Sequence, residues 1–298
     1  MRILFTADLH LSPETQGHTF SKIREWLTGY HPDALVVAGD LATAQRAELA
    51  LRNLRACFPN GPLAVCLGNH DFWLENNSIR QECESLPDVI DQFWVPASKA
   101  FDVTLLDNEN LLLPNVTIVG GYGHYDLGFA VPGLAYDGVA VTEEEYVRGG
   151  RARGYAMRWG DFTYMPDGRD LRQVAADQVA GVRRRLAEVT DSQAIVALHT
   201  PPFESLLGVP SGARKLEDGN PDLRAFFRAY LGNRAMGDVL REVHDKVVAV
   251  VCGHTHRPAG PAHLDGTGML GINIGADYGA PKAALYRTDR REFERLVD

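Results

Sequence analysis

The sequence has few cysteines, no long apolar run and no N-terminal targeting pattern. Its 298 residues include four cysteines, and no two of them form a C-x-x-C pair. No apolar run approaches the roughly 20 residues that cross a bilayer. The stretch Ile3-Leu4-Phe5 is shorter than a signal-peptide core, and Asp8 follows it closely. These absences exclude a disulfide-stapled secreted domain and favour a protein of the reducing cytoplasm without a membrane partner.

The chain also lacks an excess of positive charge. Its 30 Lys and Arg residues are outnumbered by 39 Asp and Glu residues, which gives a formal net charge of −9. Without an overall basic field, nucleic acid is not the favoured partner, although a local basic groove stays open as an alternative. Because 45% of the residues are hydrophobic, the chain can bury a sizeable core. This composition favours an enzyme for small molecules and does not indicate an oligomeric state.

The first 70 residues alternate between buried strands and amphipathic helices. Apolar runs predict strands at Ile3–Ala7, Ala34–Ala38 and Leu63–Leu67. Apolar residues at helical spacing predict helices at Phe20–Leu27 and Arg46–Phe58. This β-α-β-α-β order implies parallel strands joined by right-handed crossovers.

The rest of the chain adds strands of mixed type and further helices. Turn residues separate three short runs that predict an antiparallel meander: Phe101–Leu106, Asn110–Leu113 and Val116–Gly120. One long amphipathic helix is expected at Leu171–Val189, and two shorter ones near Asp222–Tyr230 and Ala235–Val243. Two more buried strands are expected at Ala194–Leu198 and Val247–Cys252.

Metal-ligand residues follow five of the predicted strands. In chain order these segments are Asp8-Leu9-His10, Gly39-Asp40, Gly68-Asn69-His70-Asp71, His199 and Gly253-His254-Thr255-His256. Strands that end in such residues can bring them together at one sheet edge, as α/β proteins build their sites. Carboxylate, carboxamide and imidazole groups suit divalent ions such as Mn, Fe and Zn. The pattern therefore predicts a dinuclear metal hydrolase.

The order and content of these segments resemble the calcineurin-like metallophosphoesterase superfamily. Its pattern is D-x-H, G-D, G-N-H-[DE], H and G-H-x-H, and all five blocks occur in that order between residues 8 and 256. The resemblance implies an α/β fold, a four-layer α/β/β/α sandwich of two mixed sheets flanked by helices. It also implies that residues 1–298 form one domain.

The resemblance assigns the metal ligands. Asp40 would bridge two divalent transition metal ions, whether Mn, Fe or Zn. The ligands of the first ion would be completed by Asp8, His10 and His256, and those of the second by Asn69, His199 and His254. The neutral amide of Asn69 limits the negative charge of the site, which leaves a net positive centre for an anionic phosphate.

The resemblance also assigns the catalytic residues. A hydroxide that bridges the metals would attack phosphorus in line. His70 is not a ligand in this scheme and would stabilise the phosphoryl oxygens or protonate the leaving oxygen. Asp71 would hold the His70 imidazole in its tautomer and orientation.

The segment from Tyr122 to Met165 has no steady period. It contains nine aromatic residues in 44 positions. Long irregular stretches in compact domains often act as lids or binding loops, so the segment is either a lid or an insertion whose aromatics pack on the body. His124 and Tyr125 are candidate substrate contacts. Arg257, directly after the pair His254 and His256, is a further candidate for phosphate contact or a surface residue.

The particular residues that this chain carries in and near the five blocks favour one substrate class within the superfamily. The protein serine/threonine phosphatases of the superfamily carry an arginine shortly after the G-D block. Their third block reads G-N-H-E. Here Leu-Ala-Thr-Ala-Gln follows Asp40, and the fourth position is Asp71. The versions present are similar to the phosphodiesterase-like branch, so we expect a small phosphodiester substrate, with nucleotide-like esters among the candidates. The alternatives are a phosphomonoesterase, an exonuclease (which the acidic charge disfavours) and a metal-binding regulatory protein without catalysis.

Overall fold

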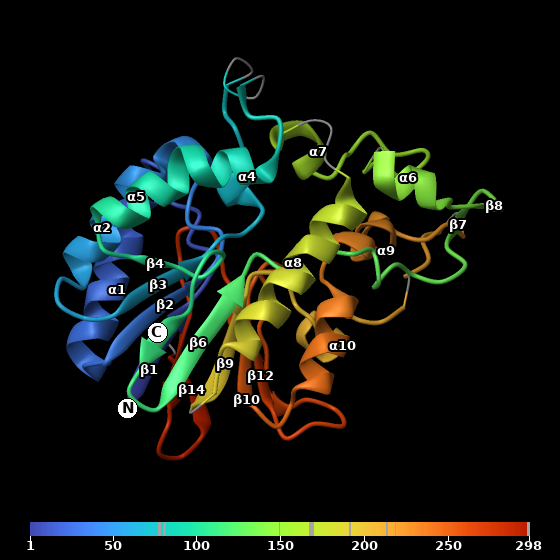
Figure 1. Cartoon of the computed structure of the whole chain (residues 1–298). Helices are drawn as coiled ribbons and strands as arrows, with labels where there is room; N and C mark the ends of the chain where they lie inside the picture. Colours follow the sequence, from blue (N-terminus) through green and yellow to red (C-terminus); the bar gives the residue numbers. More distant parts are fainter. Residues whose placement is uncertain are drawn as a thin grey trace.

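The computed structural model describes residues 1–296 except 77, 78, 80, 81, 149, 167–169, 191, 213 and 218. Two six-stranded sheets form its centre (Figure 1). The first, sheet A, has the order β14 (Glu292–Leu296), β13 (Ala283–Arg287), β1 (Arg2–Thr6), β2 (Ala34–Ala38), β3 (Leu63–Cys66) and β4 (Thr104–Leu105). Strands β1 to β4 are parallel, β13 pairs antiparallel with β1, and β14 pairs antiparallel with β13.

The second sheet, sheet B, is built from the middle and the end of the chain. Its order is β11 (Ala259–His263), β12 (Leu270–Asn273), β10 (Val247–Cys252), β9 (Gln193–Leu198), β6 (Val116–Gly121) and β5 (Leu111–Leu113). Strands β6, β9, β10 and β12 are parallel, whereas β5 and β11 run antiparallel to their neighbours. Both sheets are therefore mixed.

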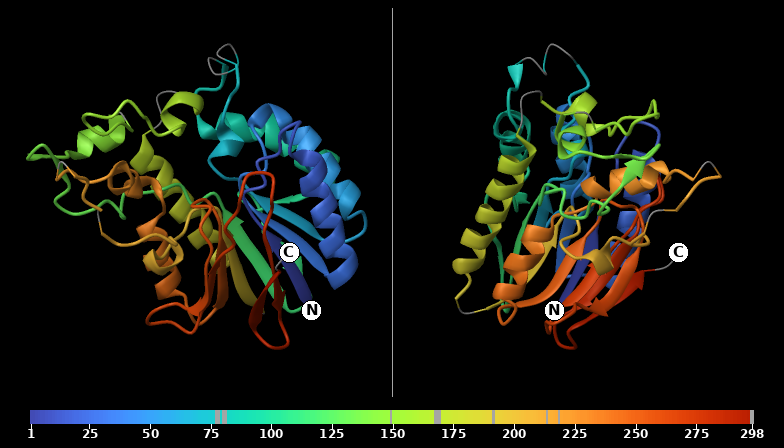
Figure 2. Two further views of the ribbon diagram at one scale, coloured as in Figure 1. Left: turned by 180° about the vertical axis from the view of Figure 1, so that it is seen from behind. Right: turned by 90° about the vertical axis from the view of Figure 1, so that its right-hand side faces the viewer.

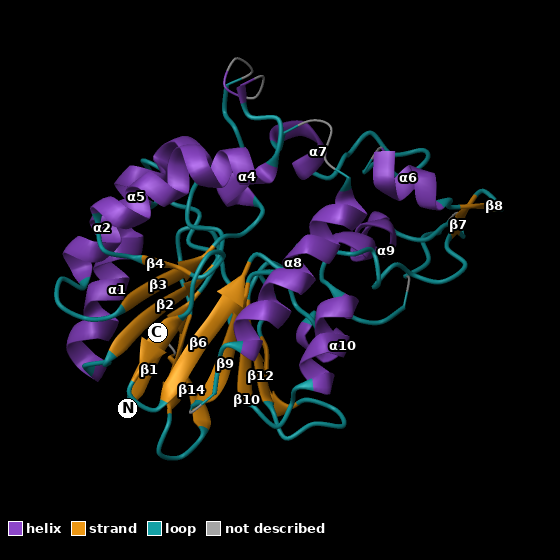
Figure 3. Cartoon of the chain, in the orientation of Figure 1, coloured by secondary structure: helices purple, strands orange, loops and turns teal. Residues whose placement is uncertain are grey.

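Helices cover the outer face of each sheet, as Figures 2 and 3 show. Sheet A is covered by α1 (Gln16–Tyr30), α2 (Ala47–Cys57), α4 (Leu86–Val89) and α5 (Val95–Ala100). Sheet B is covered by α8 (Leu171–Ala187) and α10 (Arg234–Glu242). The predicted α/β/β/α sandwich of two mixed sheets is confirmed. Among the described residues, no helix combines the length and the apolarity of a membrane span.

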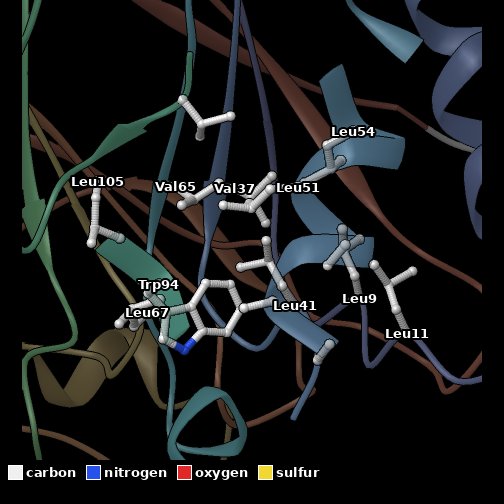
Figure 4. Packing of buried hydrophobic residues seen from close by; sticks show 14 of the residues in the cluster. Leu9, Leu11, Val37, Leu41, Leu51, Leu54, Val65, Leu67, Trp94 and Leu105 are labelled. Carbon is white, nitrogen blue, oxygen red and sulfur yellow. The ribbon is translucent and has the colours of Figure 1, made fainter. Parts of the chain in front are cut away.

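The alternation of side chains along each strand creates separate apolar layers. In β1, Ile3 and Phe5 face the other sheet, while Leu4 faces the helices. The central strands β1, β2, β3, β9 and β10 are thus buried on both faces, which explains why the sequence shows continuous apolar runs there. In Figure 4, Val37 and Val65 of sheet A lie beside Leu51 of α2.

Two features of this core differ from expectation. The predicted meander at 101–120 is wrong, because β4 pairs parallel with β3 in sheet A while β5 and β6 belong to sheet B. The chain changes sheets at Asp107, whose carboxylate accepts bonds from the Leu67 amide (2.8 Å) and the Tyr122 amide (2.8 Å). The helical stretch from α4 to α5 was not predicted, and a π-helical turn, Ile90–Trp94, joins its two parts.

The aromatic segment 122–165, of which residue 149 lies outside the described part, forms its own small cluster. It contains the hairpin β7 (Ala135–Tyr136) and β8 (Val139–Ala140), then α6 (Glu143–Arg148) and α7 (Asp161–Tyr164). Three of its buried aromatics, Tyr125, Tyr136 and Tyr146, pack against α9 (Leu223–Phe227) and the 3₁₀ turn Arg228–Tyr230. In Figure 1, α6 and α7 lie beyond the upper ends of the strands.

Candidate metal centre

All five ligand segments follow the carboxyl ends of parallel strands. Those strands are β1, β2 and β3 in sheet A and β9 and β10 in sheet B. Because the two sheets face each other across a shared apolar layer, these ends lie at one edge of the sandwich. The seven ligands predicted from the sequence are brought together there: Asp8, His10, Asp40, Asn69, His199, His254 and His256.

Four of these residues form the first ligand group. Ligand atoms of Asp8, His10, Asp40 and His256 all lie within 4.8 Å of one another. Nε2 of His10 is 2.8 Å from Nε2 of His256 and 3.5 Å from Oδ2 of Asp40. Two imidazoles and two carboxylates that converge in this way suit one divalent transition metal ion.

The second ligand group lies on the other side of Asp40. Oδ1 of Asn69 is 3.0 Å from Nε2 of His199 and 3.0 Å from Nδ1 of His254. Nε2 of His199 is 3.3 Å from Oδ1 of Asp40. The two oxygens of Asp40 therefore face different groups, Oδ2 toward His10 and Oδ1 toward His199. A carboxylate in this position can hold two ions.

Backbone carbonyls fix which nitrogen each buried imidazole offers. Nδ1 of His199 lies 3.1 Å from the Ala38 carbonyl, and Nε2 of His254 lies 2.9 Å from the Tyr230 carbonyl. An N–H at those positions leaves Nε2 of His199 and Nδ1 of His254 as electron-pair donors toward Asn69. Such partners orient metal-binding histidines and raise their basicity.

Burial keeps two of the ligand histidines neutral. It lowers the pKa of His10 to about 3 and that of His254 to about 4. Burial is also the largest single influence on His199 and lowers its pKa, but the charges of Asp40 and Asp8 and the hydrogen bonds to Asp40 and the Ala38 carbonyl together outweigh it and raise the pKa to about 9. Burial would raise the pKa of Asp40, yet the surrounding imidazoles hold it well below its usual range. Metal binding requires neutral imidazoles beside an ionised carboxylate, so His199 must release its proton when an ion binds.

The backbone at the ligand positions is strained. Left-handed φ angles occur at five of the seven: 53° at Asp8, 41° at His10, 53° at Asp40, 70° at His254 and 56° at His256. A residue with a side chain in this region costs roughly 1–3 kcal/mol and persists where its surroundings hold it. Hydrogen bonds between segments do so here. The His254 amide donates to both oxygens of Asp8 (2.9 and 3.1 Å), and the His70 amide donates to Oδ1 of Asp40 (2.9 Å).

Steric space explains the glycine that precedes three ligand segments. A Cβ at Gly39 would overlap the His199 ring, one at Gly68 would overlap the Asp40 carboxylate, and one at Gly253 would overlap Asp8. Each glycine thus makes room for a ligand from another segment. The G-D, G-N-H-D and G-H-T-H blocks are physically linked in this way.

We expect Gly68→Ala to displace Asp40 and to weaken binding of both ions. Overpacking at this point should also lower the free energy of unfolding by about 1–3 kcal/mol. Calorimetric metal titration and thermal unfolding measure the two effects. Gly29→Ala in α1 is the control, because a Cβ there meets nothing within 4 Å. Wild-type metal affinity in Gly68→Ala would contradict the steric explanation.

His70 lies beside the ligands, and Trp73 orients it. Its ring stacks on Trp73 with centroids 3.6 Å apart, and its Nε2 lies 4.0 Å from Oδ2 of Asp40. The expected contact with Asp71 is not among the hydrogen bonds of the described residues. Instead, the Asp71 carboxylate accepts bonds from three backbone amides, those of Leu41, Ala42 and Gly68. The 3₁₀ turn at 70–72 directs the Asp71 side chain inward, so Asp71 holds the backbone of the ligand loops instead of the His70 ring.

A cavity of about 370 Å³ opens over the metal centre. Asp40, Asn69, His254 and His256 contribute to its base, together with His70. Trp73, Trp159, Gly160, Asp161 and Tyr278 also line it. Of the nine aromatics in the 122–165 segment, only Trp159 is among the lining residues. Five others are buried: Tyr122, Tyr125, Phe129, Tyr136 and Tyr146.

The three candidate substrate contacts lie elsewhere. His124 and Tyr125 are fully buried and do not line this cavity, because the chain turns inward after β6. Arg257 is exposed and is also absent from the lining. The residue that sequence reasoning missed is Asp161, which is fully buried and lines the cavity. Asp161 belongs to no ligand block, and nothing in the sequence indicates that it lies beside Asn69.

Comparison with known proteins gives a family and a fold. A model described as calcineurin-like phosphoesterase matches residues 1–258. Over 76 residues the chain is 37% identical to the UDP-2,3-diacylglucosamine pyrophosphatase LpxG of Chlamydia muridarum (strain MoPn / Nigg). That match covers 24% of this chain and 23% of that protein, so it spans about a quarter of the relative.

Solved structures are similar over the whole chain at low identity. The crystal structure of TT1561 of Thermus thermophilus aligns with a TM-score of 0.51 at 14% identity, covering 99% of this chain and 97% of that one. Another crystal structure aligns with a TM-score of 0.53 at 13% identity, covering 99% and 98%. At such identities the likeness concerns the fold alone.

Proposed function

Because the chain belongs to the calcineurin-like phosphoesterase family, we propose that it hydrolyses phosphodiesters with two divalent metal ions. The observation that carries this proposal is the position of Asp40. One of its oxygens faces His10 at 3.5 Å and the other faces His199 at 3.3 Å. This arrangement supports the proposal that the Asp40 carboxylate bridges the two ligand groups.

The donor set fits two transition metal ions such as Mn, Fe or Zn. Asp8, His10, Asp40 and His256 would hold one ion. Asp40, Asn69, His199 and His254 would hold the other. Such ions, when bound, act as Lewis acids toward phosphoryl oxygens and make water nucleophilic near neutral pH.

The residues of the chain then bind and orient the substrate. His70, which lines the cavity, is the proposed donor of a proton to the leaving oxygen. Stacking on Trp73 holds its ring toward Asp40 and the space above the ligands. Asp71 supports the position of His70 indirectly, because its carboxylate accepts three backbone hydrogen bonds that hold the loops of Asp40 and Asn69 together.

The charge of the cavity favours a diester over a monoester. Among the described residues that line it there is no Lys or Arg. A monoester phosphate carries close to two negative charges at neutral pH, and arginine is the residue that proteins favour for bidentate phosphate recognition. A phosphodiester carries a single negative charge, which the two ions can balance without such help.

The walls of the cavity favour a planar group on the substrate. Trp73 and Trp159 present indole rings, and Tyr278 is 69% exposed beside the rings of His10 and His256, with centroids 4.8 and 4.9 Å away. Aromatic faces bind bases by stacking. A nucleotide-like diester is therefore the proposed substrate. The name of the Chlamydia muridarum relative adds a nucleotide-linked pyrophosphate to the substrates worth testing.

The decisive experiment combines metal analysis with turnover. We expect two ions per chain and faster hydrolysis of bis-p-nitrophenyl phosphate than of p-nitrophenyl phosphate. Faster monoester turnover would identify a phosphomonoesterase, and processive release of nucleotides from DNA would identify an exonuclease. Two bound ions without turnover of any of these esters, or of a UDP-sugar, would identify a metal-binding regulatory protein.

We expect Trp159→Ala to raise KM for a nucleotide diester by roughly 5- to 150-fold, because base stacking is worth about 1–3 kcal/mol. The kinetics of a small diester that has no planar group should change less. Trp159→Phe keeps an aromatic face and should restore most of the affinity. Phe129→Ala is the matched packing control, since Phe129 is buried outside the cavity lining, and it should lower stability and all activities alike. A uniform loss in Trp159→Ala would refute the stacking role.

We further propose that the 122–165 segment is a lid held on the body by its buried aromatics, with Trp159 and Asp161 as the parts that face the cavity.

The proposed compartment is the cytoplasm. This is supported by four free thiols, three of them buried. Cell fractionation tests it, and recovery from a membrane or secreted fraction would contradict it.

A further inference from the structure

Asp161 is a buried carboxylate that binds four side-chain donors. It lies at the start of α7 and is 0% exposed. Oδ1 accepts from Nδ2 of Asn69 (3.0 Å) and Nε1 of Trp73 (2.8 Å). Oδ2 accepts from Nε1 of Trp159 (2.9 Å) and the hydroxyl of Tyr125 (3.2 Å).

All four partners are neutral, and Asp161 takes part in none of the ion pairs found among the described residues. A carboxylate is costly to bury unless its oxygens are hydrogen-bonded. An ionised carboxylate only accepts hydrogen bonds. The surrounding N–H and O–H groups are therefore all oriented toward it, and it sets their directions.

This orientation has a direct effect on Asn69. A carboxamide has an oxygen at one end and an NH₂ group at the other, and rotation by half a turn exchanges them. The NH₂ end donates to Asp161, so Oδ1 faces Nε2 of His199 and Nδ1 of His254, at 3.0 Å from each. Only the oxygen end has an electron pair suited to a metal ion.

We infer that Asp161 is a positioning residue that fixes the oxygen of Asn69 toward the second metal site and ties the 122–165 segment to that site. This inference rests on the proposed dinuclear function. Asp161 and its donors Tyr125 and Trp159 belong to the segment, whereas Asn69 and Trp73 follow β3. One carboxylate thus positions a metal ligand and two indole walls of the cavity.

The test is metal titration of the apo full-length chain by calorimetry with Mn²⁺, for wild type and Asp161→Asn. In the isosteric variant one acceptor oxygen becomes an NH₂ group, so four donors compete for the remaining oxygen and the direction of the Asn69 amide is no longer fixed. We expect affinity at the second site to fall about 10- to 100-fold, as for other residues that orient ligands. Affinity at the first site should stay within a few fold. Tryptophan emission should also shift, because Trp73 and Trp159 both lose their carboxylate acceptor.

A double variant separates positioning from mere packing. Combining Asn69→Asp with Asp161→Asn reverses donor and acceptor, so oxygen again faces the metal whichever way residue 69 rotates. We expect second-site affinity to recover to within a few fold of wild type. Tyr125→Phe removes one donor without touching Asn69 and should leave both affinities unchanged.

Different results would contradict the dinuclear function and the positioning role of Asp161. A wild-type chain that binds fewer than two ions would contradict the proposed dinuclear function itself. If wild type binds two ions and Asp161→Asn binds both with wild-type affinity, the positioning role is refuted while the function stands. Equal loss at both sites in Asp161→Asn, with no recovery in the double variant, would also refute it and show a general packing role.

Discussion

Asp40→Asn is expected to lose both metal ions and to lower turnover by on the order of 10³-fold or more. The substitution replaces one of two acceptor oxygens by an NH₂ group, so one ligand group loses its shared carboxylate. The negative charge between the groups is lost as well. Lewis-acid stabilisation by bound ions is worth several kcal/mol, and each 1.36 kcal/mol corresponds to about a tenfold change in rate. Metal content and kcat on bis-p-nitrophenyl phosphate measure the effect.

Single-site variants provide the comparison for Asp40. Among the ligand side chains Asp8 belongs to the first group, with Oδ1 3.7 Å from Nε2 of His256, while the second group reaches it through the backbone amide of His254. Asp8→Asn should therefore mainly weaken the first ion. Asn69→Ala should mainly weaken the second, because Asn69 contacts His199 and His254. If Asp40→Asn retained two ions and full turnover, the bridging assignment would be wrong.

His70→Ala is expected to keep both ions and to lower kcat by roughly 10²–10⁴-fold, the usual value of general acid–base help. The imidazole is not among the ligand contacts of Asn69, His199 or His254, and its backbone amide, which bonds Asp40, is unchanged by the substitution. The side chain is partly exposed to the cavity, so its removal should cost little stability.

Leaving-group dependence tests the role of His70. A p-nitrophenolate leaves without a proton, so the loss of rate should shrink for p-nitrophenyl esters relative to phenyl esters. Trp73→Phe is a control that keeps a ring against His70 and should cost far less. An equal loss on both esters would instead assign His70 to stabilisation of the phosphoryl oxygens.

The sequence predicted which segments meet at one edge because position along a parallel strand is easy to read, whereas the role of each ligand came from the family resemblance and stays a prediction. Asp8, Asp40 and His199 each follow a continuous apolar run, and the carboxyl ends of parallel strands meet at one edge. The α/β/β/α sandwich followed from the same runs and from the family resemblance. These features depend on hydrophobic periodicity and chain order, which single sequences display directly.

What could not be predicted depends on tertiary contacts. The strand Thr104–Leu105 joins sheet A because Asp107 bonds both sheets, and no local pattern announces that crossing. The orientation of Asp71 is set by a 3₁₀ turn instead of by its neighbour His70. Asp161 meets Asn69 across 92 residues of sequence. Propensity and spacing contain no information about such pairings.

The placement of β1 in sheet A has a consequence for synthesis of the chain. One edge of β1 pairs with β2, but the other pairs with β13, which is followed by β14. The last ligand is His256, whereas β13 begins only at Ala283. During synthesis every ligand is therefore complete while one edge of β1 is still open, and open edges invite pairing with other chains. Closing that edge joins residues separated by almost the whole chain, so this pairing has a high contact order and should be slow. We therefore expect β1, which leads directly into Asp8, to gain its second strand neighbour late in folding.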